Sequence, residues 1–267
     1  VEEVRVNTPF GEPSDRITLG SLGETGIAFL PRHGRGHVIS PTELNFRANI
    51  WALKSLGVTH IVSISACGSL RADFRPRDVV IPDQLIDFTR LRRGNTFFGN
   101  GIVVHISFAE PFCSDFSALV AKAVRQVGNV TVHEGATFIT VEGPRFSTKA
   151  ESHMFRSWGA HIIGMTASPE AQLAREAELC YACMAHVTDY DVWHETEEPV
   201  SVEAIIQNLQ ANTGVAKEAI RNLAAMFPLH PTCECGSALK MAIITDPALI
   251  AEAKRKELSL LLGKYLS

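Results

Sequence analysis

Two carboxylates separated by one residue, Asp189 and Asp191, have the types and the spacing that most directly suggest chemistry in this sequence. They follow an apolar run, 179–187, that is typical of a buried strand. Ligands of open α/β sheets bind at the carboxyl ends of strands, and alternate residues of an extended segment point the same way. Both acids are therefore expected to face one ligand, either in different protonation states or by gripping two of its donors. A solvated Asp-Tyr-Asp turn is the alternative that these residues leave open.

A basic, glycine-containing segment, Arg32–His37, follows a short predicted strand at 26–31. Arginine presents a planar fork of donors that suits phosphate, and glycine allows the backbone to approach an anion closely. The segment is therefore a candidate anion site, although a solvated basic turn explains the same residues.

Two further turns rich in small or polar residues also follow predicted strands. Ala66–Leu70 comes after the strand 58–65, and a turn of this kind exposes backbone N–H groups to an anion. Gly143–Ser147 comes after the strand 135–142 and contains Phe146, whose ring suits stacking against a flat ligand. Because the polar clusters recur at strand ends, they favour one shared ligand site over unrelated loops.

The elements that must position these groups alternate between strands and helices. Strands are expected at 26–31, 58–65, 78–82, 101–105, 135–142, 160–166 and 179–187. Helices are expected at 41–56 with Ser40 as N-cap, at 114–127 with Ser114, at 148–158, at 168–179 with Ser168, at 201–226, and at 247–263 packed on the outside. This alternation predicts a three-layer α/β/α fold with a central mixed β-sheet.

The composition is that of an ordinary globular chain. With 267 residues, 46% hydrophobic and 20% charged, and with no linker, repeat or low-complexity segment, the sequence predicts a single domain over 1–267. The net charge of −4 argues against a nucleic-acid partner, and no apolar run is long enough for a membrane span. The first residues resemble neither a signal peptide nor a methionine start. A cytoplasmic protein that handles small molecules is expected.

The cysteines are too few and too scattered for a secreted disulfide scaffold. They are Cys67, Cys113, Cys180, Cys183, Cys233 and Cys235. The pairs Cys180-x-x-Cys183 and Cys233-x-Cys235 suggest a four-sulfur zinc site, but residues three apart on a strand face opposite sides of a sheet. The sequence therefore disfavours zinc, and we expect no metal. A disulfide involving Cys233 or Cys235 is the better expectation if the source is a hyperthermophile.

Six motifs in this order resemble those of the trimeric purine nucleoside phosphorylases. They are Arg32-His33-Gly34-Arg35-x-His37, the segment Asn45–Leu53, Ala66–Leu70, Glu142–Ser147, Gly164-Met165-Thr166-x-x-Pro169-Glu170 and Thr188-Asp189-Tyr190-Asp191-x-Trp193. The resemblance covers residues 4–228. The C-terminal helical tail, 229–267, shares only a Cys-x-Cys that some thermophilic members carry.

The resemblance implies the nucleoside phosphorylase fold and the phosphorolysis of S-methyl-5′-thioadenosine in purine and methionine salvage. Inorganic phosphate, a co-substrate, attacks C1′ and releases adenine and 5-methylthioribose 1-phosphate. It also implies that no cofactor is needed, that neither nucleic acid nor membrane is a partner, and that the protein is a homotrimer or hexamer.

The same resemblance assigns roles by position. The phosphate site is assigned to Arg32, His33, Ser65, Ala66 and Thr166. The ribose contact is assigned to Met165 and the base-stacking ring to Phe146. The recognition of adenine is assigned to Asp189, the catalytic acid, at N7 and to Asp191 at the exocyclic amine. The pocket for the 5′-substituent is assigned to Val202, Ile205, Ile206 and a neighbouring subunit's copy of His105.

The residue chemistry agrees with these assignments. Cleavage of the C–N bond places negative charge on the purine, which a protonated acid near N7 relieves. A carboxylate opposite a 6-amino group accepts its N–H, but it repels the oxygen of a 6-oxopurine. An apolar 5′ pocket favours a methylthio group over a hydroxyl, which would lose hydrogen bonds there.

Two alternatives remain, and both depend on particular residues. A 6-oxopurine or methylthioinosine phosphorylase is disfavoured because such relatives usually carry Asn where this sequence has an aspartate. A non-catalytic nucleoside-binding protein is conceivable because no Gly-Gly-(Ser/Thr)-Gly turn precedes Val4, so that an N-terminal phosphate-binding segment is expected to be missing from this sequence. Ser65 stands where Thr is common, which keeps the hydroxyl.

Overall fold

The computed structural model describes residues 1–89, 93–194, 202–227 and 232–266. In the helix that starts at residue 202, the side chains of Val202, Ala204, Ile205 and Leu209 also lie outside the described part. None of the helices in these ranges combines the length and the apolar character that crossing a membrane requires.

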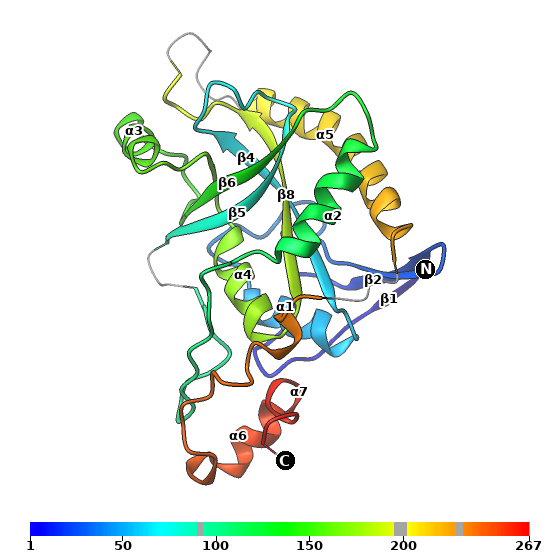
Figure 1. Ribbon diagram of the computed structural model, residues 1–267, viewed down its shortest axis with the longest axis vertical. Coiled ribbons are helices and arrows are strands. Elements are labelled where there is room, and N and C mark those ends of the chain that lie inside the picture. Colours follow the sequence, from blue (N-terminus) through cyan, green and yellow to red (C-terminus); the bar gives the residue numbers. More distant parts are fainter. Residues whose placement is uncertain (90–92, 195–201, 228–231, 267) are drawn as a thin grey trace.

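The central sheet is mixed, as the sequence predicts, and it curls until it closes (Figure 1). Its strands are β4 (His60–Ser69), β5 (Val79–Phe88), β6 (Val132–Val141), β7 (Ile162–Gly164) and β8 (Cys180–Asp189), in the order β4-β7-β6-β5-β8. β4 pairs with β8 in parallel and with β7 antiparallel, and β6 pairs with β5 and β7 in parallel. A short antiparallel pairing between β5 and β8 closes the sheet into a barrel, which the sequence did not predict.

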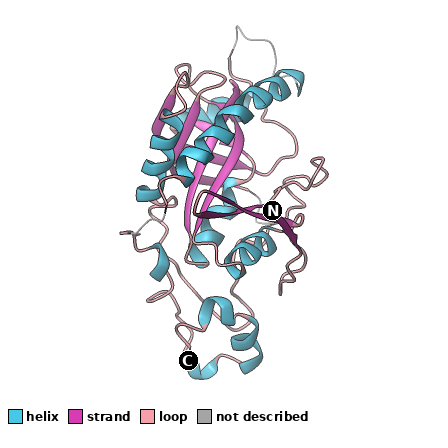
Figure 2. Ribbon diagram, turned by 90° about the vertical axis from the view of Figure 1, so that its right-hand side faces the viewer, coloured by secondary structure: helices cyan, strands magenta, loops and turns pink. Residues whose placement is uncertain are grey.

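Helices lie on both sides of the central strands (Figure 2), and β8 contributes side chains to a core on each side. Tyr181 and Cys183 point into a core shared with α1 (Phe46–Ser55) and α4 (Ala167–Glu176). Their neighbours Cys180 and Ala182 point into a second core shared with α2 (Ser114–Arg125) and α5 (Val202–Ala224). This alternation along one strand produces the predicted layers and explains why β8 reads as a continuous apolar run.

A small antiparallel sheet and one further helix complete the body. β1 (Glu2–Val4), β2 (Ile17–Leu22) and β3 (Thr25–Phe29) form the small sheet, and α3 (Lys149–Ser157) follows β6. Thr148 caps α3 through a reciprocal capping box with Glu151.

The predicted start of the first helix, with Ser40 as its N-cap, is wrong. Ser40 and Glu43 do bond to each other, but as an isolated turn, and α1 begins only after Asn45, whose side chain accepts the Ala48 N–H at 3.2 Å. The Asn45 amide also donates to the Phe10 carbonyl at 2.7 Å, so tertiary contacts fix the helix start.

The helices predicted from 114 and 168 do begin there to within one residue, as α2 and α4, but their N-cap positions are Cys113 and Thr166 rather than Ser114 and Ser168. Ser168 has an extended backbone, with φ −102° and ψ 130°, inside α4. Its hydroxyl donates to Asp87 at 2.7 Å instead of capping the helix.

The predicted strand 101–105 is wrong, and the predicted tail helix 247–263 is divided into three short helices. Only Val104 forms a bridge, to Ile243 of the tail. Beyond η1 (Cys235–Ser237), the tail contains the short helices η2 (Pro247–Leu249), α6 (Glu252–Glu257) and α7 (Ser259–Leu262). It does not merely cover the outside, because Leu239, Leu258 and Leu262 are buried in the same core as α1 and α4.

Candidate active site

Arg32 lies three residues beyond the end of β3 and reaches the middle of β4. Its guanidinium donates to the Glu170 carboxylate at 2.5 and 3.2 Å, to the Ser63 hydroxyl, and to the Ser65 hydroxyl at 3.5 Å. Ser63 and Ser65 are alternate residues of β4, so their buried hydroxyls point the same way and lie 3.2 Å apart. This arrangement gathers several donors around one point.

Glu170, at the start of α4, is the counter-charge that holds Arg32 in place. Burial is the largest single effect and lowers the pKa of Arg32, but the charge and hydrogen bonds of Glu170, together with Tyr181 and Cys183, outweigh it, so that the pKa is raised. Tyr181 of β8 donates its hydroxyl to the same carboxylate at 2.9 Å. Arg32 therefore stays charged in a buried place, which is what an anion site requires.

Asp189 is the last residue of β8, and Asp191 follows in a turn. The Asp189 carboxylate accepts from the Thr188 hydroxyl at 2.7 Å and from the Asp191 backbone N–H at 2.8 Å. Burial raises the pKa of Asp189 and outweighs these two hydrogen bonds. The protonated acid is thereby favoured relative to an exposed aspartate.

Asp191 adopts φ 52°, a left-handed conformation that Asp tolerates better than most residues. One of its carboxylate oxygens, Oδ2, is buried without a hydrogen-bond partner, and so is the nearby Ser152 hydroxyl of α3. Burial also raises the pKa of Asp191, against the opposing effect of Ser152. A buried acceptor without a partner is what a ligand donor would satisfy.

Gly68 makes room for this pair of acids. The β4–β8 register shifts between Cys67 and Gly68, which brings Gly68 opposite Asp189. A β-carbon at Gly68 would lie 3.0 Å from Asp189 Oδ1 and 3.3 Å from the β-carbon of Asp191. Ser65 and Gly68 are three residues apart, so the anion end and the acid end are separated by about 10 Å along the strand.

Met165 and Thr166 lie between these two ends. β7 runs antiparallel to β4, with Ile163 opposite Gly68, so the residues that follow β7 continue towards Ser65. Thr166 is buried at the start of α4. Met165 packs on Gly143, where a β-carbon would come within 2.5 Å of the Met165 sulfur.

Arg93 fixes the loops around Met165. Its buried guanidinium donates to the carbonyls of Met165 at 2.5 Å, Ser168 at 2.9 Å and Glu142 at 2.6 Å. It also pairs with the Glu142 carboxylate at 3.1 Å. One side chain thereby ties together the loops that follow β6 and β7.

Other residues singled out from the sequence lie at the margin. The His33 Nδ1 donates to the Ile39 carbonyl at 2.8 Å, and burial lowers the His33 pKa, which favours the neutral ring. Ala66 is exposed between the buried Ser65 and Cys67, as expected for a residue facing an opening. Phe146 is 46% exposed, and its ring is available to a ligand or a partner.

Of the residues expected around the 5′-substituent, His105 and Ile206 have described side chains, and both are exposed. His105 is exposed on the segment that bonds to the tail, where its backbone N–H donates to the Ala242 carbonyl at 2.9 Å. Ile206 is 48% exposed on α5, and the side chains of Val202 and Ile205 lie outside the described residues.

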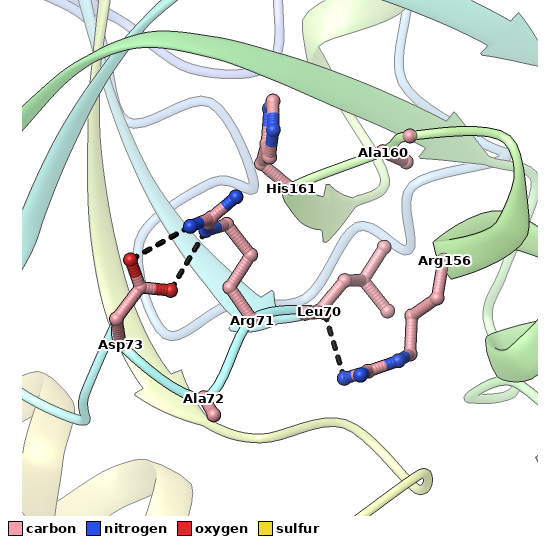
Figure 3. A pocket seen from close by; sticks show the side chains of 8 residues that line it. Leu70, Arg71, Ala72, Asp73, Arg156, Ala160 and His161 are labelled. Carbon is pink, nitrogen blue, oxygen red and sulfur yellow. Dashed lines mark hydrogen bonds and ion pairs between the residues drawn. The ribbon is translucent and has the colours of Figure 1, made fainter.

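A separate cavity of about 300 Å³ lies beside the acid end and contains none of the predicted site residues (Figure 3). In it, Arg71 forms a two-pronged ion pair with Asp73, and Arg156 donates to the Leu70 carbonyl at 2.8 Å. The Arg156 guanidinium also stacks over Trp193, whose indole N–H bonds to the Ser69 carbonyl. These contacts satisfy the cavity's charges internally, and they brace the turn after Asp191.

Sequence reasoning missed three residues that organise the site: Ser63, Arg93 and Glu170. Ser63 follows from the two-residue period of the strand, because it shares a face with Ser65. Glu170 stood inside a quoted motif, but only folding shows that it faces Arg32. Arg93 lies outside every motif described above, and nothing in its sequence neighbours signals the three carbonyls that it binds.

Comparison with known proteins gives a consistent result over the length of the chain. The sequence model of the phosphorylase superfamily matches residues 1–225. The S-methyl-5′-thioadenosine phosphorylase of Geobacter sulfurreducens is 52% identical over 266 residues, which cover 100% of this chain and 93% of the relative. That of Hyperthermus butylicus is 49% identical over 247 residues, 91% of this chain and 89% of the relative.

Solved structures agree with this finding. A methylthioadenosine phosphorylase from an Antarctic soil metagenomic library has a TM-score of 0.93 and 45% identity, covering 98% of this chain and 92% of the other. A methylthioadenosine phosphorylase of Schistosoma mansoni in complex with adenine has a TM-score of 0.85 and 38% identity, covering 90% of each chain.

Proposed function

The chain belongs to the phosphorylase superfamily, and on that basis we propose that it converts S-methyl-5′-thioadenosine and phosphate into adenine and 5-methylthioribose 1-phosphate. Curated relatives that share about half of its residues over nearly the whole length carry this activity in their names. The enzyme is a pentosyltransferase of the purine nucleoside phosphorylase type.

Phosphate binds, in this proposal, at Arg32 together with His33, Ser65, Ala66 and Thr166. The support is the buried guanidinium with two serine hydroxyls beside it. Phosphate competes with Ser63 and Ser65 for the Arg32 donors, while Glu170 continues to orient the guanidinium. The bound anion then stands where its charge stabilises a cationic ribosyl group.

The purine binds at the acid end, where Asp189 donates a proton towards N7 and Asp191 accepts from the 6-amino group. The raised pKa of Asp189 supports its role as a proton donor to the departing base. The Asp191 oxygen that has no partner in the protein supports its role as an acceptor of an amine N–H. A 6-oxo group would place an oxygen against that carboxylate, so adenine is favoured over hypoxanthine.

The remaining assignments complete the nucleoside site. Met165 contacts the ribose between the two ends, and Phe146 stacks on the base. The methylthio group is received by Val202, Ile205 and Ile206, with His105 contributed by a neighbouring subunit. This division makes a homotrimer, or a hexamer built from trimers, the expected assembly, and the reaction needs no metal or organic cofactor. A cytoplasmic location also belongs to this proposal.

The observation that carries the proposal is the spacing along β4. The buried Arg32 guanidinium lies beside Ser63 and Ser65, the acids Asp189 and Asp191 lie beside Gly68, and the distance between these two ends leaves room for a pentose. The test is to incubate the purified protein with methylthioadenosine, adenosine, methylthioinosine and inosine, each with and without phosphate. Release of free base is followed by chromatography.

Phosphate-dependent release of adenine, fastest from methylthioadenosine, is the expected result. Preferential release of hypoxanthine would show that the acid pair reads a 6-oxopurine. Release without phosphate would make the protein a hydrolase and overturn the role given to Arg32. Binding without release would leave a nucleoside-binding protein.

A further inference from the structure

Four of the six cysteines meet at one point on the side of the sheet away from Arg32. Their sulfur atoms all lie within 4.8 Å of one another, and three of the four residues are buried. The four are Cys113, Cys180, Cys233 and Cys235. They come from three separate parts of the chain: the residue before α2, the first residue of β8, and the start of the tail.

This cluster differs from the pairing suggested by the sequence. Cys180 and Cys183 do face opposite sides of β8, since Cys183 lies in the core with α1 and α4. Cys113 takes the place of Cys183, because the Cys113 backbone N–H bonds to the Tyr181 carbonyl at 2.8 Å and brings the start of α2 to the start of β8. Only the folded chain reveals this fourth ligand.

We propose that Cys113, Cys180, Cys233 and Cys235 bind one Zn²⁺ ion that attaches the tail to the sheet. Four thiolates around zinc at about 2.3 Å stand about 3.8 Å apart, which fits sulfurs that are all within 4.8 Å. The Cys180 and Cys233 sulfurs are 3.4 Å apart, so zinc requires only a small outward movement. A closed set of four sulfurs, without an open position, suits a structural zinc rather than a catalytic one.

The surroundings complement the charge of such a site. Four thiolates and Zn²⁺ carry a net charge of −2, and Cys113 is the N-cap of α2, where the helix dipole places partial positive charge. The Arg175 guanidinium acts electrostatically on Cys235 and donates to the nearby Glu110 carbonyl at 2.5 Å. Positive charge therefore lies on two sides of the sulfur cluster.

The tail is shaped to supply two ligands from neighbouring positions. Between Cys233 and Cys235, Glu234 takes φ −87° and ψ 7°, and η1 begins at Cys235, so the chain turns sharply enough for both sulfurs to converge. The Thr232 hydroxyl donates to Asp115 at 2.5 Å, which fixes the approach of the tail to α2. Residues 233 and 235 lie beyond the part matched by the superfamily model, so zinc would attach an added segment to the shared body.

The test measures metal directly in the full chain and in two variants. Wild type, Cys233→Ser and Cys183→Ala are purified under reducing conditions without chelator, and zinc is measured by plasma mass spectrometry. We expect one equivalent in wild type and in Cys183→Ala, the matched control on the same strand, and a loss of at least tenfold in Cys233→Ser. Equal zinc in wild type and Cys233→Ser would overturn the proposal.

A second measurement needs no variant and therefore does not depend on variant folding. The metal is removed from wild type by a chelator in the presence of reductant, and Co²⁺ is added. Intense visible bands of tetrahedral cobalt bound by thiolates, displaced by Zn²⁺, are expected. If the reduced protein takes up neither metal, or if its cysteines are recovered as disulfides that re-form in preference to binding zinc, the proposal is wrong.

Discussion

His186 is the buried group from which the sharpest pH effect on stability follows. It lies on β8, is 1% exposed, and neither of its ring nitrogens has a hydrogen-bond partner. Burial lowers its pKa from 6.5 to about 4, because no neighbouring group compensates the charged ring. The unfolded chain accepts a proton on this histidine below pH 6.5, whereas the folded chain does not until pH 4.

The sign follows from this difference in bound protons. Between pH 6.5 and 4 the unfolded state binds more protons, so the free energy of unfolding falls as the pH falls. At about 1.4 kcal/mol for each pKa unit, the depression from 6.5 to about 4 amounts to about 3 kcal/mol lost across that range. Replacing His186 with Leu, which is similar in size and cannot titrate, removes this loss.

Glu176 changes the free energy of unfolding with pH in the opposite direction to His186, and it therefore masks the effect of His186 in the wild type. Burial raises its pKa from 4.5 to about 7, despite hydrogen bonds from Thr96 and from the Phe97 backbone. Its contribution to stability is therefore complete below pH 4.5 and is lost as the pH rises through 7, again by about 3 kcal/mol. In wild type the two contributions nearly cancel between pH 4.5 and 6.5.

The assay is urea unfolding at fixed chain concentration at several pH values from 4 to 7, for wild type, His186→Leu, Glu176→Gln and the double variant. In His186→Leu we expect the free energy of unfolding to fall with rising pH, and in Glu176→Gln to rise with it. A His186→Leu profile parallel to that of wild type would refute the reasoning, because it would show that the buried ring does not govern this range.

Three further substitutions test the site. Gly68→Ala places a β-carbon 3.0 Å from Asp189 Oδ1, and kcat/KM is expected to fall on the order of 100-fold. Gly214→Ala is the control, because nothing lies within 4 Å of its β-carbon, and its kcat/KM should be unchanged. Equal kcat/KM values for the two variants would contradict the contact at Gly68. Arg93→Lys removes the planar guanidinium that binds three carbonyls. Steady-state kinetics should show that kcat falls on the order of 100-fold, while thermal unfolding shows that the variant is still folded at the assay temperature. Asp189→Asn should lower kcat by about 100- to 10,000-fold with little change in the phosphate KM, and an unaltered kcat would exclude this acid from proton transfer.

The sequence predicted the α/β class, the mixed sheet and most of its strands. These features depend on the local spacing of apolar residues and on the small residues that form turns at the ends of strands and helices. The strand 179–187 is an example: its continuous apolar run could only be buried on both faces, and β8 is. The position of the acids at its end followed directly.

What sequence reasoning could not supply depends on contacts between distant residues. The start of α1 moved from Ser40 to Asn45 because the Asn45 amide also binds the loop at Phe10. The tail was expected on the outside, but Leu258 and Leu262 complete a core whose other members lie far away in the chain. The Arg32–Glu170 pair spans 138 residues, and no local pattern encodes such a partnership. The roles given to the site residues remain predictions.

The way in which Arg93 holds its loops bears on how the enzyme can change over generations. Three of its bonds go to main-chain oxygens, which every amino acid provides. In the proposed site, where Met165 contacts the ribose, mutations at Met165 can therefore alter the shape offered to the sugar without detaching the loop that carries it. Arg93 itself has no such freedom, because lysine cannot reach the same oxygens together. Under the proposed assignment of Met165 to the ribose, single changes at this position are therefore expected to alter nucleoside preference while Arg93 keeps the loops in place.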